Sequence, residues 1–329
     1  MPERYSPQPD YDFARDFKGY GEEGLNPKWP NDAKIAVSFV INYEEGGESS
    51  VLQGDKTSEM ALREFSMGPP WVNERHYTTE SEYEYGSRAG FWRLFRLFTK
   101  YKMKYTLYAV AQACEEQPEV VKRSVEEGHD VASHGYRWVD YHTFTIDEEK
   151  DYIRKAITSL KALAGYAPRG WYYGRDSTHS RSLVPQVYKE MGEELVWYSD
   201  TYADDIPYWV DLPAERNEAD SKGLLMVPYS FDCNDFKFYT AAASFGDPQG
   251  FLVHLKNAFD VLYDEGLDGM PKMMTIGLHC RIMGRPGRLG ALRDFISYIS
   301  KKEGVWIATR TEIAEAFKKN HPYKKGHVA

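Results

Sequence analysis

Short apolar runs alternate with amphipathic helical segments along most of this chain of 329 residues. The hydrophobic pattern predicts strands near 35–41, 104–110, 130–133, 170–173, 195–198, 224–228, 273–278 and 305–308. It predicts helices near 87–100, 118–127, 145–163, 251–265, 287–303 and 311–319. Such alternation is typical of parallel strands joined by helical crossovers. We therefore predict an α/β fold, a distorted (β/α)7-type barrel rather than an open sheet, because polar turns follow several strands.

The alternation is broken at the N-terminus and in two long insertions. We expect residues 1–33 to form a polar arm on the body, 34–320 a single barrel domain, and 321–329 a tail. The insertions, 48–86 and 199–222, look loop-like and are rich in Tyr, Trp, Asp and Glu. They are long enough to form the walls of an active site.

Charge and cysteine content exclude several classes of function. The chain has 41 Lys and Arg against 50 Asp and Glu, a formal net charge of -9, without a basic block. Nucleic acid and anionic membranes are therefore not expected as partners. The three cysteines are too far apart for a Cys-x-x-Cys metal site or a disulfide framework. The sequence lacks an apolar leader and a run of about 18 apolar residues, so we expect a cytoplasmic protein.

Polar residues gather where predicted strands end. Glu44 and Glu45 follow the first strand, His134 follows the third, and His279 and Arg281 follow the run at 273–278. Each cluster alone also fits a solvated turn or a structural histidine. Because the carboxyl ends of barrel strands meet at one face, their joint occurrence favours a functional site. Adjacent carboxylates there can share a proton or bind a cation.

This arrangement resembles the polysaccharide deacetylase superfamily (NodB homology domain), a family of distorted barrels that act as carbohydrate esterases. The Asp-Asp-Gly motif of that family, base then metal ligand, corresponds to Glu44-Glu45-Gly46. The first histidine of its His-Ser/Thr-x-x-His motif corresponds to His134, but the second position is Trp138. The resemblance leaves Glu45 and His134 as metal ligands, whereas a catalytic zinc usually needs three.

Several motifs are similar to one branch of the superfamily, the cofactor-independent allantoinases. They lie at 42–48, 82–88, 132–138, 199–209 and 284–288. This resemblance implies hydrolysis of the cyclic amide of allantoin to allantoate in purine catabolism, without a metal cofactor. It also implies a homo-oligomer, possibly a tetramer.

Amide hydrolysis needs an activated water, a stabilised oxyanion and a protonated leaving nitrogen. By motif position we assign the base to Glu44 and the acid to His279, with Glu45 orienting and His134 binding the water or polarising the carbonyl. We expect Glu45 to raise the pKa of the base. Planar guanidinium groups match the amides of allantoin, and the predicted substrate-binding residues are Arg175, Trp138, Arg281, Arg88, Arg169 and Asp200.

Two alternatives remain open from the sequence. The first is a deacetylase of chitin, another polysaccharide or peptidoglycan, with zinc or cobalt at Glu45 and His134; fungal relatives of this branch are also labelled chitin deacetylases. The second is an inactive barrel that serves as a binding protein.

Overall fold

The structure is a computed structural model that describes residues 6–64, 68–240 and 245–326. Parts of the predicted arm (1–5), first insertion (65–67) and tail (327–329) lie outside these residues. The strands are β1 (Ile35–Tyr43), β2 (Thr106–Ala109), β3 (Asp130–Ser133), β4 (Gly170–Trp171), β5 (Trp197–Tyr198), β6 (Tyr208–Val210), β7 (Leu224–Met226), β8 (Lys272–His279) and β9 (Val305–Ile307).

These strands form one curled sheet, a half-barrel of mixed α/β type. Its order is β6-β7-β5-β4-β3-β2-β1-β8, with β9 paired to β1. Neighbours are parallel except β6 and β7, which are antiparallel. The predicted distorted barrel is confirmed, with the qualification that β6 and β8 are the two ends of the pairing order.

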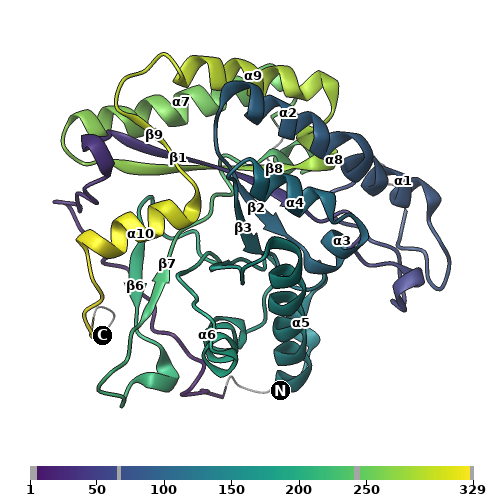
Figure 1. Ribbon diagram of the computed structural model, residues 1–329, viewed down its shortest axis with the longest axis horizontal. Helices are drawn as coiled ribbons and strands as arrows, with labels where there is room; N and C mark the ends of the chain where they lie inside the picture. The colour runs from purple at the N-terminus through teal and green to yellow at the C-terminus, as the bar shows by residue number, and fades with distance from the viewer. Residues whose placement is uncertain (1–5, 65–67, 241–244, 327–329) are drawn as a thin grey trace.

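Helices cover the outer face of the sheet, with α2, α7 and α9 together on one side and α5 and α6 on the other (Figure 1). The helices are α1 (Tyr77–Tyr85), α2 (Phe91–Tyr101), α3 (Ala111–Glu116), α4 (Glu119–Glu126), α5 (Ile146–Ala164), α6 (Ser180–Met191), α7 (Pro248–Leu267), α8 (Cys280–Met283), α9 (Pro286–Ile299) and α10 (Arg310–Asn320). A π-helical turn, η3 (Gly86–Gly90), joins α1 to α2, and a 3-10 helix, η6 (Asp235–Tyr239), follows β7.

Strand β1 is buried on both faces, as expected for a central parallel strand. Its side chains alternate. Val37, Phe39 and Ile41 pack in the core between sheet and helices, whereas Ala36 and Val40 belong to the core inside the half-barrel. This burial fixes the position of Glu44 and Glu45, the residues that follow the strand.

Several elements depart from the predicted pattern. The expected loop at 48–86 contains α1, and the expected loop at 199–222 contains β6. Helices α3, α6 and α8 were not predicted. Both insertions are therefore partly regular structure, with α1 packed on η3 and α8, and β6 paired with β7.

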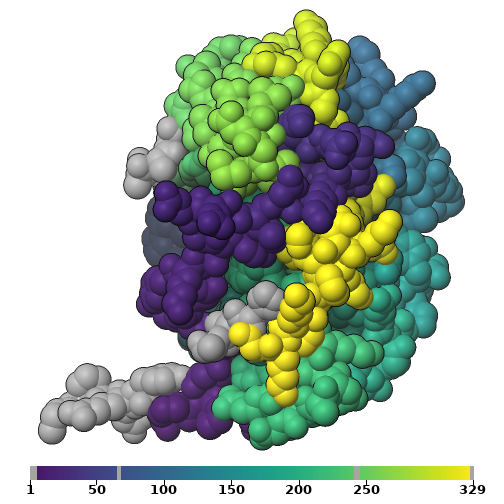
Figure 2. Space-filling view, turned by 90° about the vertical axis from the view of Figure 1, so that its left-hand side faces the viewer, coloured from purple at the N-terminus to yellow at the C-terminus, as the bar shows by residue number. Residues whose placement is uncertain are grey.

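The N-terminal segment lies along the body between the green part of the chain and the yellow C-terminal segment (Figure 2). Trp29 is buried and its Nε1 donates to Lys272 O at 3.0 Å, and Tyr20 Oη donates to Pro207 O at 2.7 Å. Near the other terminus, Asn320 Nδ2 donates to Lys28 O at 2.9 Å. In the described ranges, no helix has the length and apolar character that a bilayer crossing requires.

Candidate active site

Glu44 occupies the centre of a buried polar cluster at the carboxyl end of the sheet. Strand β1 is paired with β8 so that Asn42 lies beside His279, the last residue of β8. Gly46, with φ of 109°, lets the chain turn directly after the two glutamates. His134 enters from the end of β3. The structure thus brings together Glu44, Glu45, His134, His279 and Arg281.

Both carboxylate oxygens of Glu44 face cationic or imidazole groups. Oε1 lies 3.2 Å from His134 Nε2 and 3.5 Å from His279 Nε2. Oε2 lies 2.8 Å from Arg281 Nη1, an ion-pair distance without hydrogen-bond geometry, and within the described chain this oxygen has no hydrogen-bond donor. The side chains of Glu44, His134 and Arg281 are each 1% exposed.

The two histidines are oriented by groups on their far sides. His134 Nδ1 lies 3.2 Å from Tyr172 O. His279 Nδ1 lies 2.6 Å from Asp235 Oδ1, and the His279 backbone N–H donates to Asp235 Oδ2 at 2.8 Å. Both rings therefore direct Nε2 at the Glu44 carboxylate.

The charged groups of the cluster shift one another's pKa values in opposite directions. Burial opposes ionisation of Glu44, but Arg281, His279 and the bond from His134 lower its pKa well below the ordinary value. Burial and the neighbouring Glu44 raise the pKa of Glu45, with Arg281 opposing. For His279, burial is outweighed by Glu44 and Asp235, and its pKa rises to about 9. The expectation that the pKa of Glu44 is raised is wrong, because Arg281, His279 and His134 together outweigh the effect of burial.

Glu45 binds Arg281 and the backbone. Its Oε1 accepts from the Arg281 backbone N–H at 3.2 Å and lies 3.4 Å from Arg281 Nη1, while Oε2 accepts from the Glu44 N–H at 3.1 Å. Arg281 Nε donates to Leu62 O at 3.0 Å. Glu45 is thus placed to orient Arg281, and both carboxylate oxygens of Glu45 already accept hydrogen bonds.

The indole of Trp138 contacts two arginines, Arg175 and Arg281, and Arg281 belongs to the cluster. The Arg175 guanidinium lies 3.6 Å from the indole centroid, and that of Arg281 lies 5.2 Å away. Arg175 also pairs with Glu59 at 3.1 Å, not with one of the aspartates after β5. Trp138 therefore contacts the cluster through Arg281, and Arg175 lies against Trp138.

Three predicted substrate-binding residues lie elsewhere or serve other contacts. Arg169 precedes β4, at the strand end opposite the site, and pairs with Glu315 and Glu194. Arg88 is exposed on η3. The structure does not bring either to the cluster.

The third of these residues, Asp200, accepts backbone N–H groups of Tyr173 and Gly174. Burial, then Asp176, raises its pKa to about 7. It therefore fixes the turn after β4.

Two residues of the site were missed in the sequence. Asp235 orients His279, and Glu59 pairs with Arg175. Asp235 follows the predicted strand at 224–228, so the rule that polar residues collect after strands could have found it. Glu59 lies in an insertion, where no such rule applies.

Comparisons with known proteins agree with this geometry. The polysaccharide deacetylase family model matches residues 78–196. A Schizosaccharomyces pombe protein named "Putative polysaccharide deacetylase" is 48% identical over 304 residues, which cover 91% of this chain and 94% of that protein. The chain belongs to the polysaccharide deacetylase family.

Two solved structures are similar over nearly the whole chain. One is described as a "probable Polysaccharide deacetylase" from Pseudomonas aeruginosa PAO1 and the other as Puue Allantoinase. Each has a TM-score of 0.87, is 44% identical, and covers 95% of this chain and 100% of its own. These findings place the chain among the hydrolases of the polysaccharide deacetylase family.

The catalytic metal that the family resemblance implies does not fit these residues. Its remaining ligands would be Glu45 and His134, but the Arg281 guanidinium already lies beside both glutamates. A divalent cation there would be repelled by this permanently charged group. Trp138, in the position of the second histidine, supplies an indole that cannot bind a metal. We therefore derive no catalytic step through a metal here.

Proposed function

We propose that this protein hydrolyses the cyclic amide of allantoin to allantoate without a catalytic metal. The observation that carries the proposal is Arg281, whose guanidinium lies 2.8 Å from Glu44 and 3.4 Å from Glu45. A fixed organic cation beside the base can stabilise developing negative charge, as a metal would. The similarity to Puue Allantoinase supports the same substrate.

The site offers one group for each proton transfer. Glu44 Oε2 has a free lone pair and accepts a proton from water as the water oxygen adds to the amide carbon. Arg281 Nη2, which has no hydrogen-bond partner in the described part of the chain, is available to donate to the oxyanion. His279, protonated at neutral pH because its pKa is about 9, gives its Nε2 proton to the leaving nitrogen as the C–N bond breaks. Exchange with water then removes the proton from Glu44 and restores the proton on His279 Nε2.

A deacetylase of N-acetyl sugars is the second candidate, because two of the similar proteins carry polysaccharide deacetylase names. That reaction breaks the same type of bond and would use the same base and acid. A homo-oligomer and a cytoplasmic location stay predictions.

The test is an assay of chelator-treated protein with allantoin and, in parallel, with chitin oligomers and peptidoglycan. We expect allantoate and no acetate. Acetate release that requires added zinc or cobalt, without allantoate, would replace the proposal with the deacetylase.

Glu44→Gln tests the role of the base. We expect turnover to fall by about 10²–10⁴-fold while allantoin still binds. Glu119→Gln on the surface of α4 is the charge-matched control and should keep full activity. Binding of allantoin without turnover in the unaltered protein would support an inactive binding barrel instead.

A further inference from the structure

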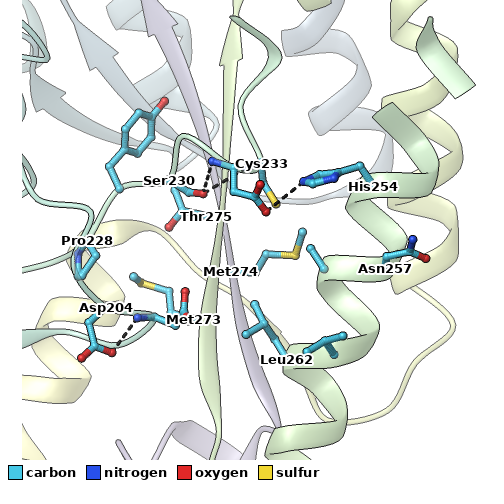
Figure 3. Close-up of a pocket in the computed structure, with 15 residues that line it drawn as sticks. Asp204, Pro228, Ser230, Cys233, His254, Asn257, Leu262, Met273, Met274 and Thr275 are labelled. Carbon is cyan, nitrogen blue, oxygen red and sulfur yellow. Dashed lines mark hydrogen bonds and ion pairs between the residues drawn. The ribbon is translucent and has the colours of Figure 1, made fainter. Parts of the chain in front are cut away.

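A cavity of about 370 Å³ lies beside β8, on the edge of that strand which no other strand covers. Loops complete this edge: Gly277 N donates to Cys233 O at 3.0 Å, and Met273 N donates to Asp205 O at 2.8 Å. Helix α7 forms the opposite wall with His254 and Asn257 (Figure 3). The cavity therefore lies between the loop that follows β7, the edge of β8 and helix α7, and it is separate from the Glu44 cluster.

Cys233 and His254 point toward each other at the upper end of this cavity in Figure 3, and the neighbouring Asp232 completes a group of three side chains with metal-binding atoms. Asp232, Cys233 and His254 each offer one ligand atom, and these atoms all lie within 4.8 Å of one another. Cys233 and Asp232 come from the loop, and His254 comes from α7. Carboxylate, thiolate and imidazole together are typical ligands of zinc and similar divalent cations.

Both carboxylate oxygens of Asp232 already have a partner with which a bound cation would compete. Lys237 Nζ binds Oδ1 at 3.2 Å, and His254 Nε2 lies 3.0 Å from Oδ2. The Asp232 side chain is 63% exposed and that of His254 is 34% exposed, so a hydrated ion can reach them. A cation between Asp232 Oδ2 and His254 Nε2 would take a position that both groups already face.

Cys233 is a free cysteine, and its side chain is buried. A bound divalent cation supplies the positive charge that stabilises a thiolate, and the thiol proton is released on binding.

We propose that Asp232, Cys233 and His254 form a binding site for a divalent transition-metal cation of the zinc class, with the remaining coordination position facing the cavity. The cation would join the loop to α7. Asn234 and Asp235 follow in the chain, and Asp235 orients His279. The cation would thus stabilise the loop next to Asp235, which positions the catalytic acid. This role does not depend on which substrate the protein hydrolyses.

The experiment is a titration of the full-length, chelator-treated protein with Co²⁺ and Zn²⁺, each alone. We expect one equivalent of Co²⁺ to produce a thiolate-to-cobalt charge-transfer absorption in the near ultraviolet, and Zn²⁺ to displace it and raise the melting temperature. Cys233→Ser should lose the charge-transfer band, and Cys114→Ser, a buried cysteine on α3, should keep it. His254→Gln should weaken Zn²⁺ binding at least about tenfold.

The readouts are optical and calorimetric, so failure of this site and failure of the allantoin assay are distinguishable. Absence of stoichiometric Zn²⁺ binding, or binding that is equal in Cys233→Ser and the unaltered protein, would overturn the site. Because His254 is partly exposed, His254→Gln is expected to fold even if Cys233→Ser does not. Unchanged Zn²⁺ affinity in that variant would by itself contradict the site.

Discussion

Arg281 is the residue on which the charge of the site depends. It is buried, it pairs with both Glu44 and Glu45, and its guanidinium lies 4.2 Å from the Tyr83 ring centroid. In Arg281→Met, two buried carboxylates lose their cation. Loss of one partner of a buried ion pair costs about 3–5 kcal/mol. We expect the free energy of unfolding, measured in urea, to fall by about this amount and turnover to be lost.

Arg169→Met is the matched control for Arg281→Met. Arg169 also pairs with two glutamates, but at the surface, with its own side chain 37% exposed. Surface pairs contribute about 0–1 kcal/mol. Equal destabilisation by the two substitutions would show that the buried position of Arg281 is not what matters.

The pKa of His279 sets the alkaline limit of activity. Glu44 and Asp235 raise it from 6.5 to about 9. The stabilisation from this pairing is complete below the unfolded value of 6.5 and is lost as the pH rises through about 9. Because the acid must be protonated, kcat/KM should fall above about pH 9.

Asp235→Asn tests this assignment. It removes a charge that raises the pKa of His279, so the alkaline limb of the kcat/KM profile should move to lower pH. Asp151→Asn, on the surface of α5, should leave the profile unchanged. An alkaline limb at the same pH in Asp235→Asn would remove His279 from the role of acid.

At the residue scale, the sequence predicts which polar residues lie at the ends of strands, but it does not predict how these residues shift one another's pKa values. Glu44, His134 and His279 were predicted because each follows an apolar run, and the structure brings them together. The direction of the Glu44 pKa shift was missed, because the groups that lower this pKa are far away along the chain: His134 follows β3, His279 ends β8, and Arg281 lies on α8. Only the folded sheet places those charges beside Glu44.

At the scale of elements, the π-helical turn η3 makes room for Glu45. A Cβ on Gly86 would overlap the Glu45 carboxylate. Gly86→Ala should therefore displace Glu45, release its hold on Arg281 and lower kcat by at least about tenfold. Steady-state kinetics would measure this loss.

Gly290→Ala is the control for Gly86→Ala. Gly290 lies in α9, and nothing lies within 4 Å of an added Cβ. Alanine there should stabilise the helix by up to about 1 kcal/mol with activity unchanged. Full activity in Gly86→Ala would mean that η3 does not constrain Glu45.

Elements with a strong local signal were predicted, and elements without one were not. The Thr145–Glu148 capping box was predicted to begin a helix, and α5 begins there and ends before Gly165. Helix α6 carries Pro185 in its interior, and β6 is a short edge strand within a polar insertion. Their local sequences do not favour the structures that tertiary packing imposes.

At the scale of the whole molecule, the length of the strand pairing differs between the two ends of the sheet. β1 pairs with β8 from Ile35–Lys272 to Asn42–His279 and with β2 on its other side. By contrast, β5 pairs with β7 only at Tyr198–Met226, and β6 is a short antiparallel edge strand. Glu44 follows β1, His279 is the last residue of β8, and Arg281 lies two residues after it, so all three groups depend on the two long paired strands.

Amide hydrogen exchange should reveal this difference. Amides of β1 and β8 should exchange only through global unfolding, whereas those of β6 and β7 should exchange through local opening, faster and with a weaker dependence on denaturant. Because Glu44 follows β1 and His279 ends β8, opening of the β6–β7 edge should leave the bond between them intact. Equal protection across the sheet would mean that the catalytic cluster and this edge unfold as one unit.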